Sequence, residues 1–290
     1  MSFWIVTDVG SDMSLDFYKR YDKLRVLPMI YCMDGQEKKY YVEDEPILKD
    51  FYRKLRDGRQ ASTAAVPVDS AAGAFEEIVK QGGQVLYITL SSGISASIQS
   101  GELAAEMVLE KHPDAKISVV DSLLASGGQL LMVYYALKLR EEGKTLEEVV
   151  TWLTDNRQRF NSWFTVDDLN HLFRGGRVSR SSALIGSMLR IKPVMHVNHE
   201  GKLIPMSKTQ GRKRSLKELA EKVIEMANPK EGQPIFLSHG DCMEDAQYLA
   251  DLVRDGLPGN AGFEFVTLGT IIGAHAGPGT VAIFFLGDHR

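Results

Sequence analysis

The chain has 290 residues, of which 44% are hydrophobic and 25% are charged, and its formal net charge is −4. A chain of this length and composition is typical of a soluble globular protein with two modest domains. The negative net charge argues against a general surface for nucleic acids or anionic membranes.

The first predicted strand covers residues 3–7, and the start of the chain has neither a basic segment nor a long apolar run, so no signal peptide is expected. Cys32 and Cys242 are the only cysteines and show no CxxC spacing. We therefore expect reduced thiols and a cytoplasmic location. The longest late apolar run, residues 281–286, is too short to cross a membrane.

Short β-rich segments alternate with helical patterns along the rest of the chain. Strands are expected over residues 3–7, 24–31, 85–90, 116–121, 163–166, 193–198, 234–238, 263–268 and 280–286. Helices are expected over residues 70–80, 96–111, 123–142, 145–159, 215–226 and 243–255. This alternation predicts an α/β fold of βαβ units with largely parallel sheets. A boundary near residues 156–161 divides the chain into an N-terminal α/β domain (1–159) and a C-terminal α/β domain (160–290).

Three polar residues, Asp8, Ser11 and Asp12, directly follow the first predicted strand. Ligands in open α/β sheets bind at the carboxyl ends of strands, so these side chains are well placed to contact one. Ser11 or Asp12 is equally suited to capping the next helix. The sequence leaves both roles open and predicts no metal site there.

Two further segments place hydroxyl groups at the start of a predicted helix. Ser62 and Thr63 precede a helix that is expected to begin near Pro67 or Val68, and residues 91–95 (Ser-Ser-Gly-Ile-Ser) join an apolar strand to a helix. Free N–H groups, hydroxyls and the positive end of the helix dipole together favour a bound anion. Each hydroxyl could instead cap its own helix. Because two such helix starts can converge on one anion, the sequence predicts a site for a carboxylate or a phosphate.

Two glycine-rich segments carry candidate partners for that anion. Arg174 and Arg177 flank paired glycines, and arginine offers a forked donor that suits a carboxylate or a phosphate. His275 lies in a segment rich in Gly and Pro, where an imidazole can donate to an oxyanion. Solvated arginines in a plain turn and a structural histidine are the alternatives.

Other chemistries have weaker support. Ser92, His275 and an aspartate could form a hydrolase triad, but the Gly-x-Ser-x-Gly pattern is absent around residues 91–95. The first strand is not followed by Gly-x-Gly-x-x-Gly, and no Walker A motif occurs, so no nucleotide cofactor is expected. A basic run enters the helix expected over 215–226 and consists of Lys208, Arg212, Lys213, Arg214 and Lys217. Such runs are mostly solvated surface, and a docking patch for an acidic partner is the second interpretation.

Taken together, these segments resemble the DegV family from end to end. The resemblance is carried by residues 5–8 with Ser11 and Asp12, 90–95, 120–122 with Ser126 and Gly127, 164–169, 172–179, 191–194 and 273–279. Each motif is modest, but seven of them in the family's order are hard to explain by chance.

The resemblance implies two α/β domains with one long-chain fatty acid buried near their junction. In the family, hydroxyls from two loops hold the carboxylate, and the acyl chain runs into an apolar tunnel. Ser92 matches the family's carboxylate-binding serine, and Ser62, followed by Thr63, stands where the family usually has the threonine of Thr-Ser-Gln-Pro-Ser. His275 and Arg177 match a supporting network around the carboxylate. The chain departs from the family pattern at residues 64–66, where Ala-Ala-Val replaces Gln-Pro-Ser.

Some members of the family are the fatty-acid-binding subunit of a bacterial fatty acid kinase. A separate kinase then phosphorylates the bound acid to an acyl-phosphate for phospholipid synthesis. The resemblance therefore implies a non-catalytic lipid-binding protein with no cofactor, no metal, no nucleic acid and no membrane insertion, and with a fatty acid kinase as candidate partner. Burying an acyl chain gains about 0.8 kcal/mol per methylene, and neutral donors can hold the carboxylate. A Ser92-dependent esterase or acyltransferase is the alternative.

Overall fold

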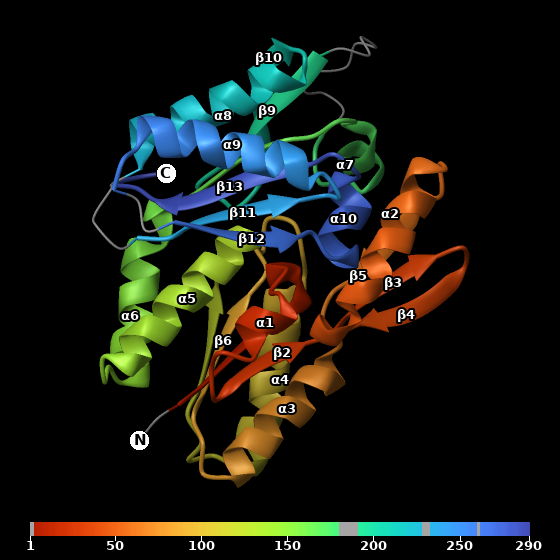
Figure 1. Cartoon of the computed structure of the whole chain (residues 1–290). Coiled ribbons are helices and arrows are strands. Elements are labelled where there is room, and N and C mark those ends of the chain that lie inside the picture. The colour runs from red at the N-terminus through yellow and green to blue at the C-terminus, as the bar shows by residue number, and fades with distance from the viewer. Residues whose placement is uncertain (1–2, 180–190, 228–232, 260–261) are drawn as a thin grey trace.

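The computed structural model of the chain describes residues 3–179, 191–227, 233–259 and 262–290. Two larger sheets and one small sheet are packed together with helices around and between them (Figure 1). The described helices include none long and apolar enough to cross a membrane.

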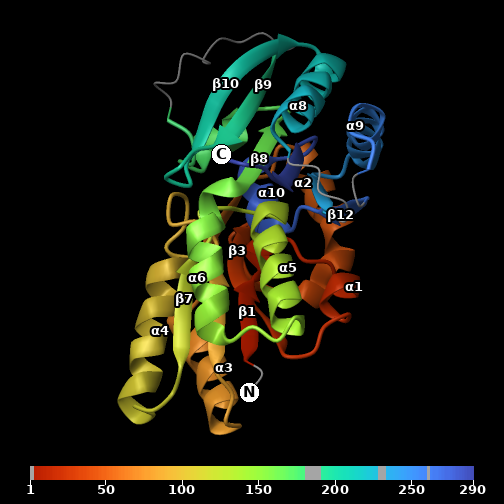
Figure 2. The ribbon, with the colours of Figure 1, turned by 90° about the vertical axis from the view of Figure 1, so that its left-hand side faces the viewer.

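The first sheet is parallel and has the strand order β2-β1-β6-β7, so the expected parallel sheet is confirmed here. Its strands are β1 (Trp4–Asp8), β2 (Leu24–Leu27), β6 (Val85–Thr89) and β7 (Ile117–Asp121). The helices packed around it are α3 (Val68–Lys80), α4 (Ser97–Lys111), α5 (Gly127–Glu141) and α6 (Leu146–Asn156), as Figure 2 shows from the side. Every residue of β6 is buried, as expected for a strand that is covered on both faces.

The small sheet is antiparallel, with the order β4-β3-β5, and was not expected from the sequence. Its strands are β3 (Met29–Met33), β4 (Gln36–Tyr40) and β5 (Ala61–Ala64). The single strand expected over residues 24–31 is broken at Pro28, which has no N–H to continue a ladder. The chain before Pro28 pairs with β1, and the chain after it turns into the small sheet. Two further helices, α2 (Leu48–Arg56) and α10 (Thr270–Ala276), pack beside it.

The second sheet has six strands in the order β10-β9-β8-β13-β11-β12. They are β8 (Phe160–Thr165), β9 (Ile191–Val197), β10 (Leu203–Gln210), β11 (Ile235–His239), β12 (Phe263–Thr267) and β13 (Val281–Leu286). The expectation of largely parallel sheets does not hold here, because every pair other than β11–β12 is antiparallel. Two connections produce this arrangement: β9 and β10 form a hairpin, and β13 lies between β8 and β11 and is antiparallel to both. The helices α8 (Arg212–Met226) and α9 (Met243–Gly256) pack on this sheet.

Helix α5 lies between the two larger sheets and packs on both. Ten of its residues are buried, from Gly127 to Leu137, which is typical of a helix that faces protein on all sides. A Cβ atom at Gly127 would come within 2.7 Å of the Phe284 ring, so this glycine allows the helix to approach β13. The strands of the first sheet and of the small sheet precede residue 160, and those of the second sheet begin there. The division into domains 1–159 and 160–290 stays a prediction, since α5 and α10 pack across it.

The six expected helices are present with shifted ends. The helix expected over 123–142 begins at Gly127, and the one expected over 145–159 ends at Asn156 and continues as a 3-10 helix, Arg157–Arg159. The remaining short elements of the described residues are α1 (Leu15–Tyr18), α7 (Asn170–Arg174) and the 3-10 helices Val9–Ser11 and Val42–Ile47.

Candidate functional site

A cavity of about 200 Å³ lies where the small sheet, the starts of α4 and α5, and the second sheet meet. One water needs roughly 10–15 Å³ of such space, so the cavity can hold a much larger molecule. Most of its wall is apolar, with Met29, Leu90, Phe164, Leu203, Ile271 and Phe284 among the lining residues. The polar exceptions are Thr63, Ser95, Ser126, Ser162, Arg177, His275 and Thr280.

Thr63 and His275 form a hydrogen-bonded pair in this wall. Thr63 Oγ1 on β5 lies 2.7 Å from His275 Nε2 at the end of α10. Burial, with a smaller contribution from the nearby Arg177 charge, lowers the pKa of His275 to about 4. The imidazole is therefore neutral near pH 7. If its Nε2 carries the proton and donates to Thr63, the Thr63 hydroxyl is free to donate its own proton to an anion.

The other nitrogen of His275 is enclosed. His275 Nδ1 is buried and has no hydrogen-bond partner in the described part of the chain. Gly175 packs against it so closely that a Cβ atom there would lie 2.1 Å from Nδ1. Glycine at this position therefore allows the turn after α7 to hold the imidazole ring in place.

Arg177 brings a positive charge to the same end of the cavity. Its Nε donates to the carbonyl of Ile94 at 3.0 Å, and one terminal nitrogen donates to the carbonyl of Gly175 at 2.5 Å. Burial lowers the pKa of this guanidinium, which still stays charged near neutral pH. Arg177 thus links the loop after β6 to the turn after α7 and favours an anion beside His275.

Ser95 supplies a second hydroxyl, at the start of α4. Its Oγ accepts from the N–H of Ser97 at 3.2 Å and lies 3.0 Å from Ser97 Oγ. Ser91, in contrast, is buried and donates to the carbonyl of Gly201 at 2.9 Å, so it connects the loop after β6 to the turn between β9 and β10. Because the first N–H groups of a helix lack intrahelical partners, Ser95 and the α4 start add to the polar end of the cavity.

Two of the five expected site residues lie outside the cavity. Ser92 is exposed, its N–H donates to Asp121 Oδ1 at 3.1 Å, and it lines a separate surface depression. Ser62 is also exposed, because side chains alternate along β5 and Thr63 takes the inward position. The positions of Ser92 and Ser62 therefore do not support their expected contact with a ligand in the cavity. A triad of Ser92 and His275 is not supported either, since the two residues border different depressions.

The sequence carried a signal for the two hydroxyl groups that line the cavity, Thr63 and Ser95. Residues 61–64 have the length of a short strand, and a strand would have put Ser62 and Thr63 on opposite faces. Ser95 stands three residues after Ser92 and directly at the helix start, where a hydroxyl meets free N–H groups.

The aspartates at the end of β1 and just after it, Asp8 and Asp12, are buried and form internal hydrogen bonds. Asp8 accepts from the N–H groups of Gly10 at 2.9 Å and Leu90 at 3.2 Å. Asp12 Oδ1 accepts at 2.7 Å from the N–H of Gly269, directly before α10, and burial raises the pKa of Asp12 to about 7. Neither aspartate lines the cavity. One interpretation of the sequence expected Asp12 to cap the helix that follows it in the chain. Asp12 instead accepts a hydrogen bond at the start of α10, much later in the chain.

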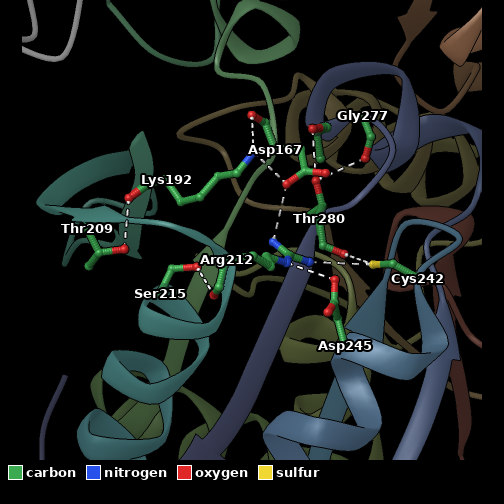
Figure 3. Close-up of polar contacts among 10 residues, drawn as sticks. Asp167, Lys192, Thr209, Arg212, Ser215, Cys242, Asp245, Gly277 and Thr280 are labelled. Atoms are coloured by element: carbon green, nitrogen blue, oxygen red, sulfur yellow. Dashed lines mark hydrogen bonds and ion pairs between the residues drawn. The ribbon is translucent and has the colours of Figure 1, made fainter. Parts of the chain in front are cut away.

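Arg212 from the basic run lies in an ion-pair cluster (Figure 3). Its Nε lies 2.8 Å from Asp245 Oδ2, and a terminal nitrogen lies 3.8 Å from Asp167 Oδ1. Lys192 Nζ is 2.9 Å from the same Asp167 oxygen. In the same cluster, burial raises the pKa of the Cys242 thiol to about 12, so this cysteine is protonated near neutral pH. Arg212 therefore has carboxylate partners within the chain.

Comparison with known proteins places the chain among relatives of the same length. The sequence model of the DegV family, described as "uncharacterised protein, DegV family", matches residues 2–288. A DegV domain-containing protein of Clostridium perfringens is 42% identical over 289 residues, which are 99% of this chain and 98% of that protein.

Solved structures agree with this match. The chain resembles a DegV lipid-binding protein of Thermotoga maritima, with a TM-score of 0.88 and 28% identity over 100% of both chains. It also resembles a fatty-acid-binding DegV family protein of Thermus thermophilus, with a TM-score of 0.88 and 28% identity over 99% of this chain and 100% of that one. The chain belongs to the DegV family.

Proposed function

We propose that this protein binds one long-chain fatty acid, with the carboxylate at the end of the cavity marked by Thr63, Ser95, Arg177 and His275. The observation that carries the proposal is the Thr63–His275 pair, which lies beside Arg177 in the wall of a largely apolar cavity. Relatives from Thermotoga maritima and Thermus thermophilus, at 27–28% identity, are described as binding fatty acids.

The energetics suit this ligand. Burying the acyl chain against the apolar wall gains about 0.8 kcal/mol per methylene, so the tail supplies most of the affinity. Hydrogen bonds to a charged carboxylate contribute about 1.5–3 kcal/mol each. Thr63 and Ser95 are therefore proposed to fix the orientation of the acid, and Arg177 to favour its charged form.

The proposed carboxylate end lies next to solvent. Thr63, Arg177 and His275 line both the cavity and a polar surface depression that also contains Ser62 and Arg174. A carboxylate held there would have one side facing outward. This supports presentation of the bound acid to a separate, cytoplasmic fatty acid kinase, whose ATP would supply the phosphoryl group of an acyl-phosphate for phospholipid synthesis. In this proposal the protein itself is not an enzyme.

Organic extraction of the purified protein followed by mass spectrometry tests the binding proposal. About one fatty acid per chain, and uptake of added fatty acid by the extracted protein, are the expected results. Absence of lipid together with no uptake would contradict the proposal. The kinase step is tested by adding ATP and a candidate kinase to the loaded protein and trapping the acyl-phosphate with hydroxylamine; the loaded protein without kinase is the control.

A further inference from the structure

The inner wall of the cavity contains a hydroxyl group that a plain hydrocarbon tail would leave without a hydrogen bond. Ser162 on β8 lines the cavity and is only 1% exposed. Its Oγ has no hydrogen-bond partner among the described residues. A buried hydroxyl without a partner is unfavourable, and an alanine would suit an unsubstituted acyl chain better.

Ser162 lies far from the proposed carboxylate end. Antiparallel pairing puts it directly opposite Phe284 on β13, and Phe164 opposite Ala282. Directly before β13 begins, the Thr280 hydroxyl donates to the carbonyl of Ala276, the last residue of α10, one residue after His275. A strand rises about 3.4 Å per residue, so Phe284 lies roughly 14 Å beyond Thr280. Ser162 is therefore placed to meet the middle of an acyl chain rather than its carboxylate.

The surroundings of Ser162 favour an oxygen atom. A Cβ atom at Gly128 would lie 2.9 Å from Ser162 Oγ, so the first turn of α5 faces this hydroxyl. The N-terminal end of this 15-residue helix carries partial positive charge. Serine has three staggered χ1 positions, which allow Oγ to turn from Gly128 toward a ligand.

Neighbouring hydroxyls in the wall are already engaged. Ser126 Oγ donates to Ser238 Oγ at 2.8 Å, and Thr280 Oγ1 donates to Ala276 O at 2.9 Å. Ser162 differs from both because it keeps its donor and its acceptor capacity for a ligand. A ligand hydroxyl can use either capacity, because it can accept the Ser162 proton or donate its own proton to Ser162 Oγ.

We propose that the cavity prefers fatty acids that carry a hydroxyl group in the middle of the acyl chain, and that Ser162 determines this preference. This inference rests on the proposed fatty-acid binding and adds the class of acyl chain. The ligand hydroxyl would form one hydrogen bond with Ser162 Oγ while the rest of the chain contacts the apolar wall.

Binding of stearate and of hydroxystearates with the hydroxyl at different mid-chain positions to the delipidated protein tests the inference. At least one positional isomer is expected to bind about tenfold more tightly than stearate, the factor for a net hydrogen bond of about 1.4 kcal/mol. A methyl-branched stearate with its branch at the same carbon is expected to show no such gain. Ser162→Ala should abolish the preference while binding stearate at least as tightly, whereas Ser92→Ala, outside the cavity, should keep it.

Two results would overturn the inference: stearate binds but no isomer binds more tightly, or the preference persists in Ser162→Ala. If the wild-type protein binds neither stearate nor any isomer, the proposed function fails instead. Removing an unpartnered hydroxyl should leave the unfolding midpoint of Ser162→Ala unchanged or higher, which confirms that the variant is folded.

Discussion

Thr63 and His275 are 212 residues apart in the sequence, yet their side chains meet at 2.7 Å in the wall of the cavity. One comes from the small sheet formed early in the chain and the other from α10 near its end. Asp12 helps to fix the position of α10, which carries His275, because it accepts a hydrogen bond from the N–H of Gly269 directly before that helix. The polar end of the cavity is thus assembled from both halves of the chain.

Thr63→Val is expected to weaken fatty-acid binding by roughly tenfold or more, since it removes a donor to a charged carboxylate worth about 1.5–3 kcal/mol. Thr63→Ser keeps the hydroxyl and should retain most of the affinity. Ser62→Ala, one residue away on the exposed face of β5, is the matched control and should bind normally. The measurement is titration of delipidated protein with palmitate. Equal losses in Ser62→Ala and Thr63→Val would contradict the assignment.

The pKa of His275, about 4 in the folded protein against an ordinary 6.5, predicts a pH-dependent contribution to stability. Between these values the unfolded chain binds a proton that the folded protein does not, so stability is lost as pH falls from 6.5 toward 4. At 1.36 kcal/mol per pKa unit, this amounts to on the order of 3 kcal/mol. His275→Gln should reduce that loss in urea unfolding at pH 6.5 and 4.5. The pKa of His196 is also lowered to about 4, so the contribution of His196 to the loss of stability at low pH remains in the variant. An unchanged slope would argue against a buried neutral imidazole.

The ionisation of Asp12 should change stability with pH in the opposite direction to that of His275. Burial raises its pKa from 3.8 to about 7, so the folded protein binds a proton that the unfolded chain has released. This contribution to stability is present at low pH and is lost as pH rises toward 7. Asp12→Asn removes the titration, so its stability relative to wild type should increase between pH 5 and pH 7.5. Thermal unfolding at the two pH values measures this, and a difference that does not change with pH would refute it.

The turn after α10 is predicted to require glycine at position 279. Gly279 has φ of +75°, and a Cβ atom there would lie 2.2 Å from Asp167 Oδ2. Gly143 also has a positive φ, +85°, but a Cβ atom there would have nothing within 4 Å. Gly143→Ala should therefore cost only the backbone strain of about 1–2 kcal/mol. Gly279→Ala should cost distinctly more in urea unfolding, and equal costs would show that Asp167 moves aside freely.

Much of the fold was predictable because local patterns determine it. The alternation of strands and helices through the first 121 residues predicted the parallel sheet. Helix α3 begins at Val68, directly after Pro67, as expected. The antiparallel pairing of the second sheet was not predictable, since strand direction depends on connections that the pattern does not fix. Pro28 indicated a break between two strands, but residues 24–31 were predicted as one strand because most of them are apolar.

For the candidate site, residue types were easier to predict than side-chain directions. Arg177, His275 and Thr63 line one cavity, whereas Ser62 and Ser92 do not. A shift of one residue along a strand reverses the face to which a side chain points, and this is the difference between Ser62 and Thr63. The proposed role of Ser162 could not have been predicted from the sequence, because it depends on burial without a hydrogen-bond partner among the described residues.

A crystal structure of the protein with bound stearate would test the central claim most directly. The account predicts a carboxylate oxygen within about 2.5–3.0 Å of Thr63 Oγ1, the range for O–H···O hydrogen bonds, with the acyl chain running toward Phe284. A carboxylate bound instead beside Ser92, or at the α5 end of the cavity next to Ser162, would contradict it.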